Sequence, residues 1–401
     1  MRELRNLFLF YRRENLWMYT PVLNAKEKAR ELIDIVRQQT DAPINVCTET
    51  VSIMLGALLA DLPAEEALRS VRNALFQDDI IDISNCYDAK IMQRLITGLT
   101  DNIEDKEQQS WTLRDDEDNL VDSLHQLSSI LGNADRRVCL EQLRRNDFSF
   151  VQRLVALYQI DQRSKVSLAV LKALRHCCEL HTAIVSLLLC SNLPVVLLIN
   201  NSFKAPLNEL EIASLELLCA LFSTTEKPPF THYDYFTVDF LSGILASLDD
   251  SNRLIMRFIL NFNAHFSHGE SLVVQALRQN HSLVFGQLLI DELNRRRNQK
   301  DLNAVKMILD IFTTEPEIVS TTFYDNDLRV LCDVLCRDLL DTDIPEKMTM
   351  ILKVLERMCL PDGHGDVREI SESIETLLLS EELSDDHRQH AEIILRLGQS
   401  H

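Results

Sequence analysis

Two cysteines and a histidine in the last fifth of the chain have the types and spacing that could coordinate a metal ion. Cys332 and Cys336 are four residues apart, so a helix would place both thiols on one face, and His364 follows in a glycine-containing segment. Thiolate and imidazole groups are ligands of zinc. Free cysteine also behaves as a small apolar residue, and both thiols fall on an apolar helix face. We favour this second interpretation and expect neither a metal site nor a cofactor.

Catalytic residues are equally hard to assemble from this sequence. His265, His268 and His281 are close in the chain, but His268 stands beside a glycine in a predicted loop and the three share no helix face. A glycine-rich phosphate loop, a GxSxG turn, an HExxH helix and a CxxC pair are all missing from the 401 residues. These patterns supply the phosphate cradle, the nucleophile or the metal ligands of common enzyme classes. We therefore expect that the protein is not an enzyme.

Clusters of positive charge stand out because the chain carries a net charge of −20. Lys165, Lys172 and Arg175 share one helix face, at spacings of seven and three residues. Two further clusters are Arg136, Arg137, Arg144 and Arg145, and then Arg295, Arg296, Arg297 and Lys300. They could be solvated helix faces, or partners for the negative C-terminal ends of helices. They could instead hold an acidic or polar element of another protein, with the aromatic loop Pro228–Phe236 as an apolar anchor nearby. Both interpretations stay open.

The element that best predicts the architecture is the stretch Phe323–Thr342, FYDNDLRVLCDVLCRDLLDT. Its apolar residues recur at the spacing of one helix face, at Leu328, Leu331, Cys332, Leu335, Cys336 and Leu339. Such a stripe predicts an amphipathic helix that packs on its neighbours. Asp325 and Asn326 are candidate N-caps. Val330 and Val334 form a second apolar row, and Arg329, Asp333, Arg337 and Asp338 are left for solvent.

The rest of the chain repeats this pattern. Hydrophobic residues make up 46% of the sequence, whereas glycine and proline number only 9 and 10, which disfavours a turn-rich β fold. We count about twenty helices in units that recur roughly every forty residues, the period of armadillo and HEAT arrays. The sequence therefore predicts an all-α, armadillo/HEAT-like, right-handed superhelical solenoid. We expect N-terminal capping helices at 1–100, a core domain at 101–360 that opens with a solvated acidic connection at 101–122, and C-terminal capping helices at 361–401.

Charge and hydropathy bear on where the protein works. With a pI of about 5.0, non-specific binding to nucleic acid or to an anionic membrane is not expected. No stretch approaches the run of about 18 apolar residues that spans a bilayer, so we expect no membrane insertion. The ten cysteines are scattered over predicted apolar faces, which is typical of reduced thiols in the cytoplasm.

The amino-acid sequence of Phe323–Thr342 resembles the leucine-rich, armadillo-like domain of the WISH/DIP family of actin regulators. This family includes Nck-interacting SH3 proteins and the fungal Dip and Ldb relatives. The same resemblance continues, in order and with similar spacing, through most of Asn102–Leu360. The segments that carry it are Gln109–Asp118, Asn133–Arg163, Leu171–Val195, Pro229–Phe236 and the leucine-asparagine helix Arg257–Phe266. Vertebrate members carry an SH3 domain and a proline-rich region ahead of this part. Neither occurs in these 401 residues, so adaptor binding through such modules is not expected.

The resemblance implies a function in the actin cytoskeleton. In the family, the armadillo-like part binds the Arp2/3 complex and activates it without a preformed filament, giving a linear filament that can seed a branched network. The implied partners are the Arp2/3 complex, actin indirectly, and formins or SH3 adaptors, at the actin cortex or in endocytosis. The alternative is a general armadillo-type scaffold for a formin, an endocytic protein, an adaptor or a transport cargo.

The expected contact residues combine the clustered charge with the family-like segment. Lys172 and Arg175 come first, with Lys165 as a third, because they form a cationic face on an acidic protein. Arg329 and Asn326 follow, because they are polar residues of the Phe323–Thr342 helix, although Asn326 could equally serve as a helix cap.

Overall fold

The structure is a computed structural model that describes residues 24–61, 66–108, 117–204, 206–249, 253–295, 302–360, 365–379 and 383–398. Throughout these ranges the chain forms helices, turns and loops, and no strand. The all-α prediction is therefore confirmed. The chain divides into two compact units, Met1–Ile160 and Asp161–His401. The three-part division at residues 100 and 360 stays a prediction.

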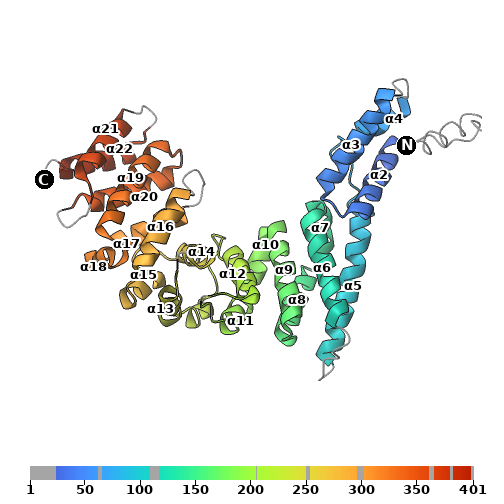
Figure 1. The fold of residues 1–401 in the computed structure, drawn as a ribbon, viewed down its shortest axis with the longest axis horizontal. Coiled ribbons are helices and arrows are strands. Elements are labelled where there is room, and N and C mark those ends of the chain that lie inside the picture. Colours follow the sequence, from blue (N-terminus) through green and yellow to red (C-terminus); the bar gives the residue numbers. More distant parts are fainter. Residues whose placement is uncertain are drawn as a thin grey trace, which may run out of the picture. The chain divides into compact units, whose positions relative to one another are not determined.

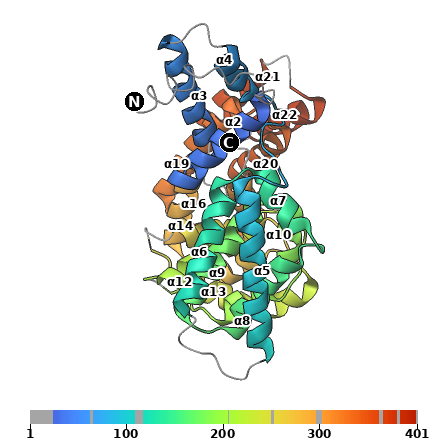
Figure 2. The same cartoon turned by 90° about the vertical axis from the view of Figure 1, so that its right-hand side faces the viewer.

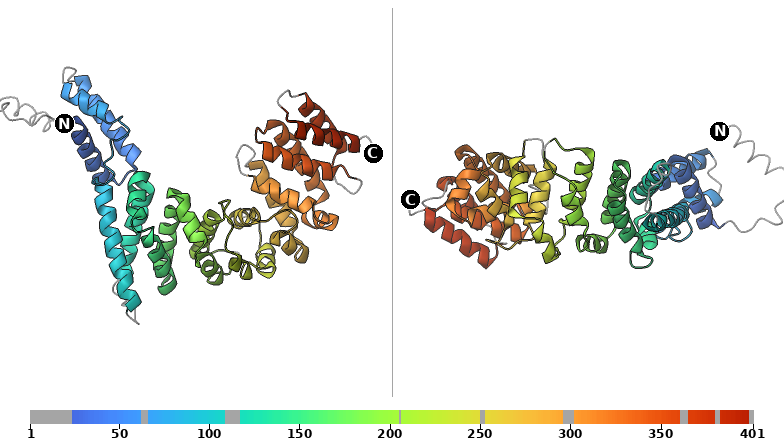
Figure 3. Two further views of the ribbon diagram at one scale, coloured as in Figure 1. Left: turned by 180° about the vertical axis from the view of Figure 1, so that it is seen from behind. Right: turned by 90° about the horizontal axis from the view of Figure 1, so that it is seen from below.

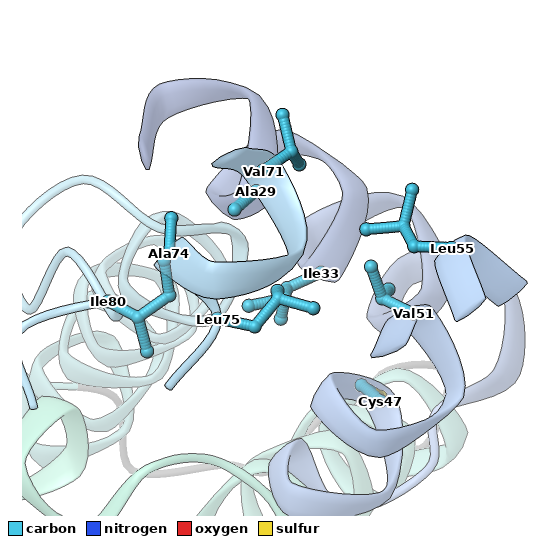
Figure 4. Packing of buried hydrophobic residues seen from close by; sticks show 9 residues of the cluster. All are labelled: Ala29, Ile33, Cys47, Val51, Leu55, Val71, Ala74, Leu75 and Ile80. Carbon is cyan, nitrogen blue, oxygen red and sulfur yellow. The ribbon is translucent and has the colours of Figure 1, made fainter. Parts of the chain in front are cut away.

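The first three helices that the structure describes in unit 1 share one apolar cluster. Its helices are α2 (Ala25–Thr40), α3 (Ile44–Asp61), α4 (Glu66–Ala74), α5 (Tyr87–Gln108), α6 (Glu117–Asn133), α7 (Arg136–Arg144) and α8 (Ser149–Ile160). The Asn24 side chain accepts from the Glu27 amide and so starts α2 as its N-cap. Figure 4 shows the cluster, in which Ala29 and Ile33 of α2 pack with Val51 and Leu55 of α3 and with Val71 of α4.

The acidic connection expected at 101–122 is helical over the residues that the structure describes. Helix α5 continues to Gln108, and α6 begins at Glu117; residues 109–116 lie outside the described ranges. Leu99 and Ile103, one helical turn apart, are fully buried and hold the extended end of α5 in place. Figure 2 shows α5 running beside α6. The described acids of this segment are mostly exposed, as expected of a solvated connection, but they lie on helices, because one buried side of a helix can carry many exposed acids.

Unit 2 holds the rest of the helices. They are α9 (Ser164–Leu180), α10 (Thr182–Leu189), α11 (Leu193–Ile199), α12 (Glu209–Leu221), the 3₁₀ turn η3 (Phe230–Asp234), α13 (Val238–Ala246), α14 (Arg253–Asn263), α15 (Leu272–Gln279), α16 (Leu283–Arg295), α17 (Asn303–Phe312), α18 (Pro316–Thr322), α19 (Asp325–Asp341), α20 (Pro345–Met358), α21 (Val367–Leu378) and α22 (Asp385–Gly398). Helix α12 starts with a complete capping box, in which Asn208 and Glu211 bond each other's backbone amides.

The helices of unit 2 pack in two rows. Along one row α9 contacts α12, α12 contacts α14, α14 contacts α17, α17 contacts α20 and α20 contacts α22. In the other, α13 packs on α15 and α15 on α18, and further along α16 packs on α19 and α19 on α21. Figures 1 and 3 show this succession from green through yellow to red. Each helix touches mainly its neighbours in the rows, which is the packing of an armadillo- or HEAT-like solenoid.

The Phe323–Thr342 stretch forms α19 as predicted, and its stripe is buried. The side chains of Leu328, Leu331, Cys332, Leu335, Cys336 and Leu339 are at most 2% exposed. The N-cap is Tyr324, so Asp325 and Asn326 already belong to the first helical turn, and the predicted caps were wrong by one or two residues. Val334 is buried but Val330 is 48% exposed, so only part of the second apolar row is covered.

A buried ion pair links α19 to α20. Asp338, which we expected on the outside, is 1% exposed, and Lys347 Nζ lies 2.8 Å from its Oδ1. Arg337 is exposed as expected, and its Nε donates to the backbone carbonyl of Asp333. Helix periodicity predicted that Asp338 faces solvent. It is buried instead, because Lys347 of α20 supplies a positive charge that the α19 sequence does not contain.

One described helix, α3, has the length and hydropathy of a membrane span, and the bent pair α10 and α11 reaches that length only when the two helices are taken together as one span. This differs from our expectation that no stretch approaches such a length. The test rests on length and composition alone, and the side of α3 with Cys47, Val51 and Leu55 lies in the apolar cluster of unit 1.

Candidate functional site

A groove in unit 2 crosses three successive helices of one row. It has a volume of about 490 Å³ and is lined by α9, α12 and α14, with Val185 of α10 at its edge. Lys172 and Arg175 of α9 line one side and Arg257 of α14 lines the other. The structure thus places the two leading residues of the predicted contact surface together on the wall of one concavity.

The hollow follows from side-chain size. On α9, Lys172, Arg175 and Glu179 recur at the spacing of one helix face and form a wall of long side chains. The middle helix, α12, presents Ala213 and Ala220 to the groove. Because these side chains end at Cβ, the surface of α12 is low at both positions, on either side of the longer Glu216 side chain.

The walls carry mixed charge. Lys172 and Arg257 are exposed cations, and Glu216 of α12 is an exposed anion between them. Arg175 Nη1 donates to Glu179 Oε1 at 2.7 Å, an i, i+4 pair on the rim. At an exposed position such a pair contributes only about 0.3–0.5 kcal/mol, so a partner's carboxylate can replace Glu179 at little cost. The groove is therefore suited to a partner segment with acidic groups on an otherwise polar surface.

The other predicted contact residues lie elsewhere. Lys165 is exposed in the first turn of α9 and does not line the groove. Asn326 and Arg329 are exposed, three residues apart on α19, and Tyr324 and Val330 beside them are each 48% exposed. The structure thus gives two surfaces, the groove and an exposed turn of α19. Sequence reasoning missed Arg257, because we considered its helix only for its leucine-asparagine pattern.

The floor of the groove is held in place by buried amides on α14. Asn261 Nδ2 donates to the Cys219 carbonyl of α12 at 2.8 Å, and Asn303 of α17 donates to Asn261 Oδ1 at 3.0 Å. Asn263 Nδ2 donates to Asp310 of α17 at 2.7 Å, and Lys306 Nζ lies 2.6 Å from the same carboxylate oxygen. Buried amides and carboxylates need such partners, and here they fix α12, α14 and α17 to one another.

The histidines considered above take up separate structural positions. His265 Nε2 lies 3.0 Å from the Phe222 carbonyl, and burial lowers the pKa of its imidazole. His268 pairs with Asp310, at 2.6 Å, and His281 is exposed. Among the described residues, no three side chains of histidine, cysteine, aspartate or glutamate are grouped as metal ligands would be. His364 lies outside the described ranges.

Cys332 and Cys336 are fully buried between α19 and its neighbours, as the apolar interpretation predicted. The neighbouring Cys336 thiol and burial raise the pKa of Cys332, so this group stays protonated at neutral pH. A thiol in that state is a poor nucleophile and a poor metal ligand.

A carboxyl pair next to these thiols makes stability depend on pH. The hydrogen bond that protonated Glu369 donates to the carboxylate of Asp333, together with partial burial, raises the pKa of Glu369 to about 7, with Asp366 adding repulsion and Arg337 opposing it. A raised carboxyl pKa means that the folded state holds a proton that the unfolded state has lost. We expect the stability contributed by this proton to be present below pH 4.5 and to be lost as the pH rises to about 7. Urea unfolding of Glu369→Gln across that range should show a shallower decline than the parent chain; parallel curves would contradict the assignment.

The other candidate segments contribute less. Phe230 of η3 is 84% exposed and contacts the Tyr233 ring, Tyr235 is 46% exposed, and Phe236 is buried, so the Pro228–Phe236 loop presents two aromatic side chains on an anchored turn. Arg137 lies in the first turn of α7 and pairs with Asp135, its N-cap, so it does not partner the C-terminal end of this helix. Arg295 ends α16, and residues 296–300 of that basic cluster lie outside the described ranges.

Comparison with known proteins gives a family match and a likeness to solved structures. Residues 248–361 match the family described as SPIN90/Ldb17, leucine-rich domain. This range contains α14 and α19, the two helices that carried much of the resemblance. A designed armadillo repeat protein, solved in complex with the peptide (KR)4, aligns with 77% of this chain and 99% of its own, at 12% identity and a TM-score of 0.24. We base the solenoid on the helix rows described above and not on this likeness.

Proposed function

Because residues 248–361 carry the leucine-rich domain of the SPIN90/Ldb17 family of actin-related proteins, we propose that the chain binds the Arp2/3 complex and activates it without a preformed filament. The product would be a linear actin filament that can seed a branched network. The protein acts in this proposal as a binding scaffold at the actin cortex, with no bond made or broken.

The observation that carries the proposal is the groove between α9, α12 and α14. It combines the cations Lys172, Arg175 and Arg257 in a chain of net charge −20. Clustered cations on an acidic protein favour a partner surface with acidic groups, which contributes to specificity. The buried amide network between α12, α14 and α17 keeps the groove in one shape, so little ordering is needed when a partner binds.

Activation by binding requires a difference in affinity. The complex must exist in an inactive and an active arrangement, and the scaffold shifts the balance only as far as it binds the active one more tightly. Moving a population from 1:99 to 99:1 takes about 5.5 kcal/mol of differential binding. The groove and a second surface on α19 contact different parts of the partner. They supply this difference in affinity when only the active arrangement of the partner presents both parts at the right spacing.

The test is fluorescent actin assembly with purified Arp2/3 complex and no filament seeds, with single filaments imaged. We expect rapid growth of linear filaments only when both proteins are present. The double variant Lys172→Glu/Arg175→Glu should weaken binding at least about tenfold, equal to about 1.4 kcal/mol, because both replacements turn attraction into repulsion. Its helicity and melting temperature should match the parent chain, since Lys172 is exposed and Arg175 makes only a rim pair.

Lys353→Glu is the matched control, because Lys353 is an exposed lysine in the middle of α20, away from the groove lining. It should assemble filaments like the parent chain. Equal loss in Lys353→Glu and in the groove variant would show a general effect of charge and sink the groove assignment. If the folded parent chain does not accelerate actin assembly at all, Arp2/3 activation is ruled out and the general function of a protein-binding scaffold remains. A pull-down from cytosol would then identify a formin, endocytic or adaptor partner.

The α19 surface is a separate contribution to the same proposal. Arg329 and Asn326 are exposed beside the apolar side chains of Tyr324 and Val330, a mixture typical of protein contacts. Arg329→Glu tests it in the same assembly assay. Reduced activity together with unchanged binding to the isolated complex would assign α19 to activation, and loss of binding would assign it to docking.

A further inference from the structure

The groove of unit 2 presents charges of alternating sign across its width. Lys172 of α9 is exposed on one wall and Arg257 of α14 on the other, and Glu216 of α12 is exposed between them. Helix α12 contacts both α9 and α14, so this order follows from the packing of the three helices. The exposed charges therefore alternate as positive, negative and positive from wall to wall.

The structure does not use these three charges itself. Among the residues that it describes, Lys172, Glu216 and Arg257 form no ion pair and no side-chain hydrogen bond, although all three line one groove. A carboxylate that serves to hold neighbouring helices together pairs with a cation, as Asp338 of α19 does with Lys347 of α20. The Glu216 carboxylate is instead available to a bound partner.

The surface around Glu216 has room for a long side chain. Ala213 and Ala220 lie three residues before and four residues after it on the same face of α12, and both end at Cβ. A lysine or arginine packs its aliphatic stem on such a low apolar surface while its charged end reaches a carboxylate. A partner's carboxylate at the same place would meet the like charge of Glu216, which lowers affinity. The floor of the groove therefore favours a basic side chain.

We propose that the groove binds a segment of the partner in which one basic residue lies between acidic residues. The basic group pairs with Glu216, and the acidic groups pair with Lys172 on one wall and with Arg257 on the other. This inference rests on the proposed function, because it takes the groove as the partner-binding surface. It adds that Glu216 determines specificity, since a segment with acidic groups alone would leave a carboxylate facing this residue.

The purified Arp2/3 complex tests the sign of the effect. Glu216→Lys adds a positive charge to a groove with cations on both walls, so a partner surface with acidic groups alone would bind this variant more tightly. Because the partner places a basic group there, Glu216→Lys should instead weaken binding to the complex by about tenfold, and Glu216→Gln should weaken it less. Helicity and melting temperature should match the parent chain, since Glu216 is exposed and unpaired.

Glu375→Lys is the matched control. It makes the same change of charge at an exposed position of α21 that does not line the groove, so it should bind the complex like the parent chain. Equal weakening in Glu375→Lys and Glu216→Lys would show a general effect of charge and overturn the role of Glu216.

Three labelled peptides provide a test that does not need the complex. They carry glutamates on both sides of a central lysine, glutamine or glutamate, and their binding to the full chain is followed by fluorescence anisotropy. We expect the parent chain to bind the lysine peptide about tenfold more tightly than the glutamate peptide. Because the chain is acidic as a whole, the decisive result is the reversal of this order in Glu216→Lys, with the order unchanged in Glu375→Lys.

The outcomes separate this inference from the proposed function. Reversal of the peptide order in Glu216→Lys, together with a parent chain that does not bind the complex, would support the charge pattern and overturn the Arp2/3 complex as the partner. The inference is overturned if Glu216→Lys keeps the parent's peptide order, or if it binds the complex at least as tightly as the parent does. It is also overturned if Glu375→Lys reverses the order, or if the parent chain binds none of the three peptides.

Discussion

Replacing Lys347 with methionine is expected to lower the free energy of unfolding of unit 2 by about 3–5 kcal/mol, the cost of leaving a buried charge without its partner. Lys347 is 2% exposed and Asp338 1%, and Lys347 Nζ lies 2.8 and 2.7 Å from the two carboxylate oxygens. Methionine has a similar length but cannot donate a hydrogen bond. Urea unfolding followed by circular dichroism measures the effect.

Two comparisons identify the cause. In the double variant Lys347→Met/Asp338→Leu both charges are gone, and most of the lost stability should return, because burying apolar groups of similar size costs nothing electrostatic. The control Arg368→Met breaks an exposed pair whose side chains are 89% and 65% exposed, and should change stability by less than about 1 kcal/mol. A loss in Lys347→Met no larger than in Arg368→Met would show that the buried pair is not what holds α19 to α20.

Gly286→Ala is expected to cost about 1–3 kcal/mol, although alanine is the better helix former. Gly286 lies inside α16, where the end of α18 comes closest to it. A Cβ atom there would stand 2.0 Å from the Thr322 carbonyl oxygen and 2.9 Å from the Phe323 ring. A backbone carbonyl cannot rotate aside as a side chain does, so α16 and α18 must move apart. The melting temperature and the urea concentration at the midpoint of unfolding should both be lower than in the parent chain.

Gly243→Ala is the matched control for this prediction. Gly243 lies inside α13, and a Cβ atom there meets nothing within 4 Å. The substitution should stabilise the chain by up to about 1 kcal/mol, since glycine has the poorer helix propensity. Opposite signs at the two glycines would confirm that close helix approach decides the result at Gly286. A gain at both would place α18 farther from α16 than described.

The helix content, and which side of an individual helix is buried, could be predicted from the sequence. The spacing of Leu328, Leu331 and Leu335 identified the buried side of α19. Periodicity works here because a helix repeats its faces every 3.6 residues whatever surrounds it. The charge cluster Lys172 and Arg175 was also visible as one helix face.

Only the tertiary structure decided which faces meet. It buried Asp338 against Lys347, brought Arg257 to the same groove as Arg175, and left Ile53 and Met54 of the apolar helix α3 uncovered. These outcomes depend on which helices become neighbours and on where along its axis each helix contacts the next. Loop geometry and the packing of whole helices set that arrangement, and neither is encoded in the residue spacing of any one helix.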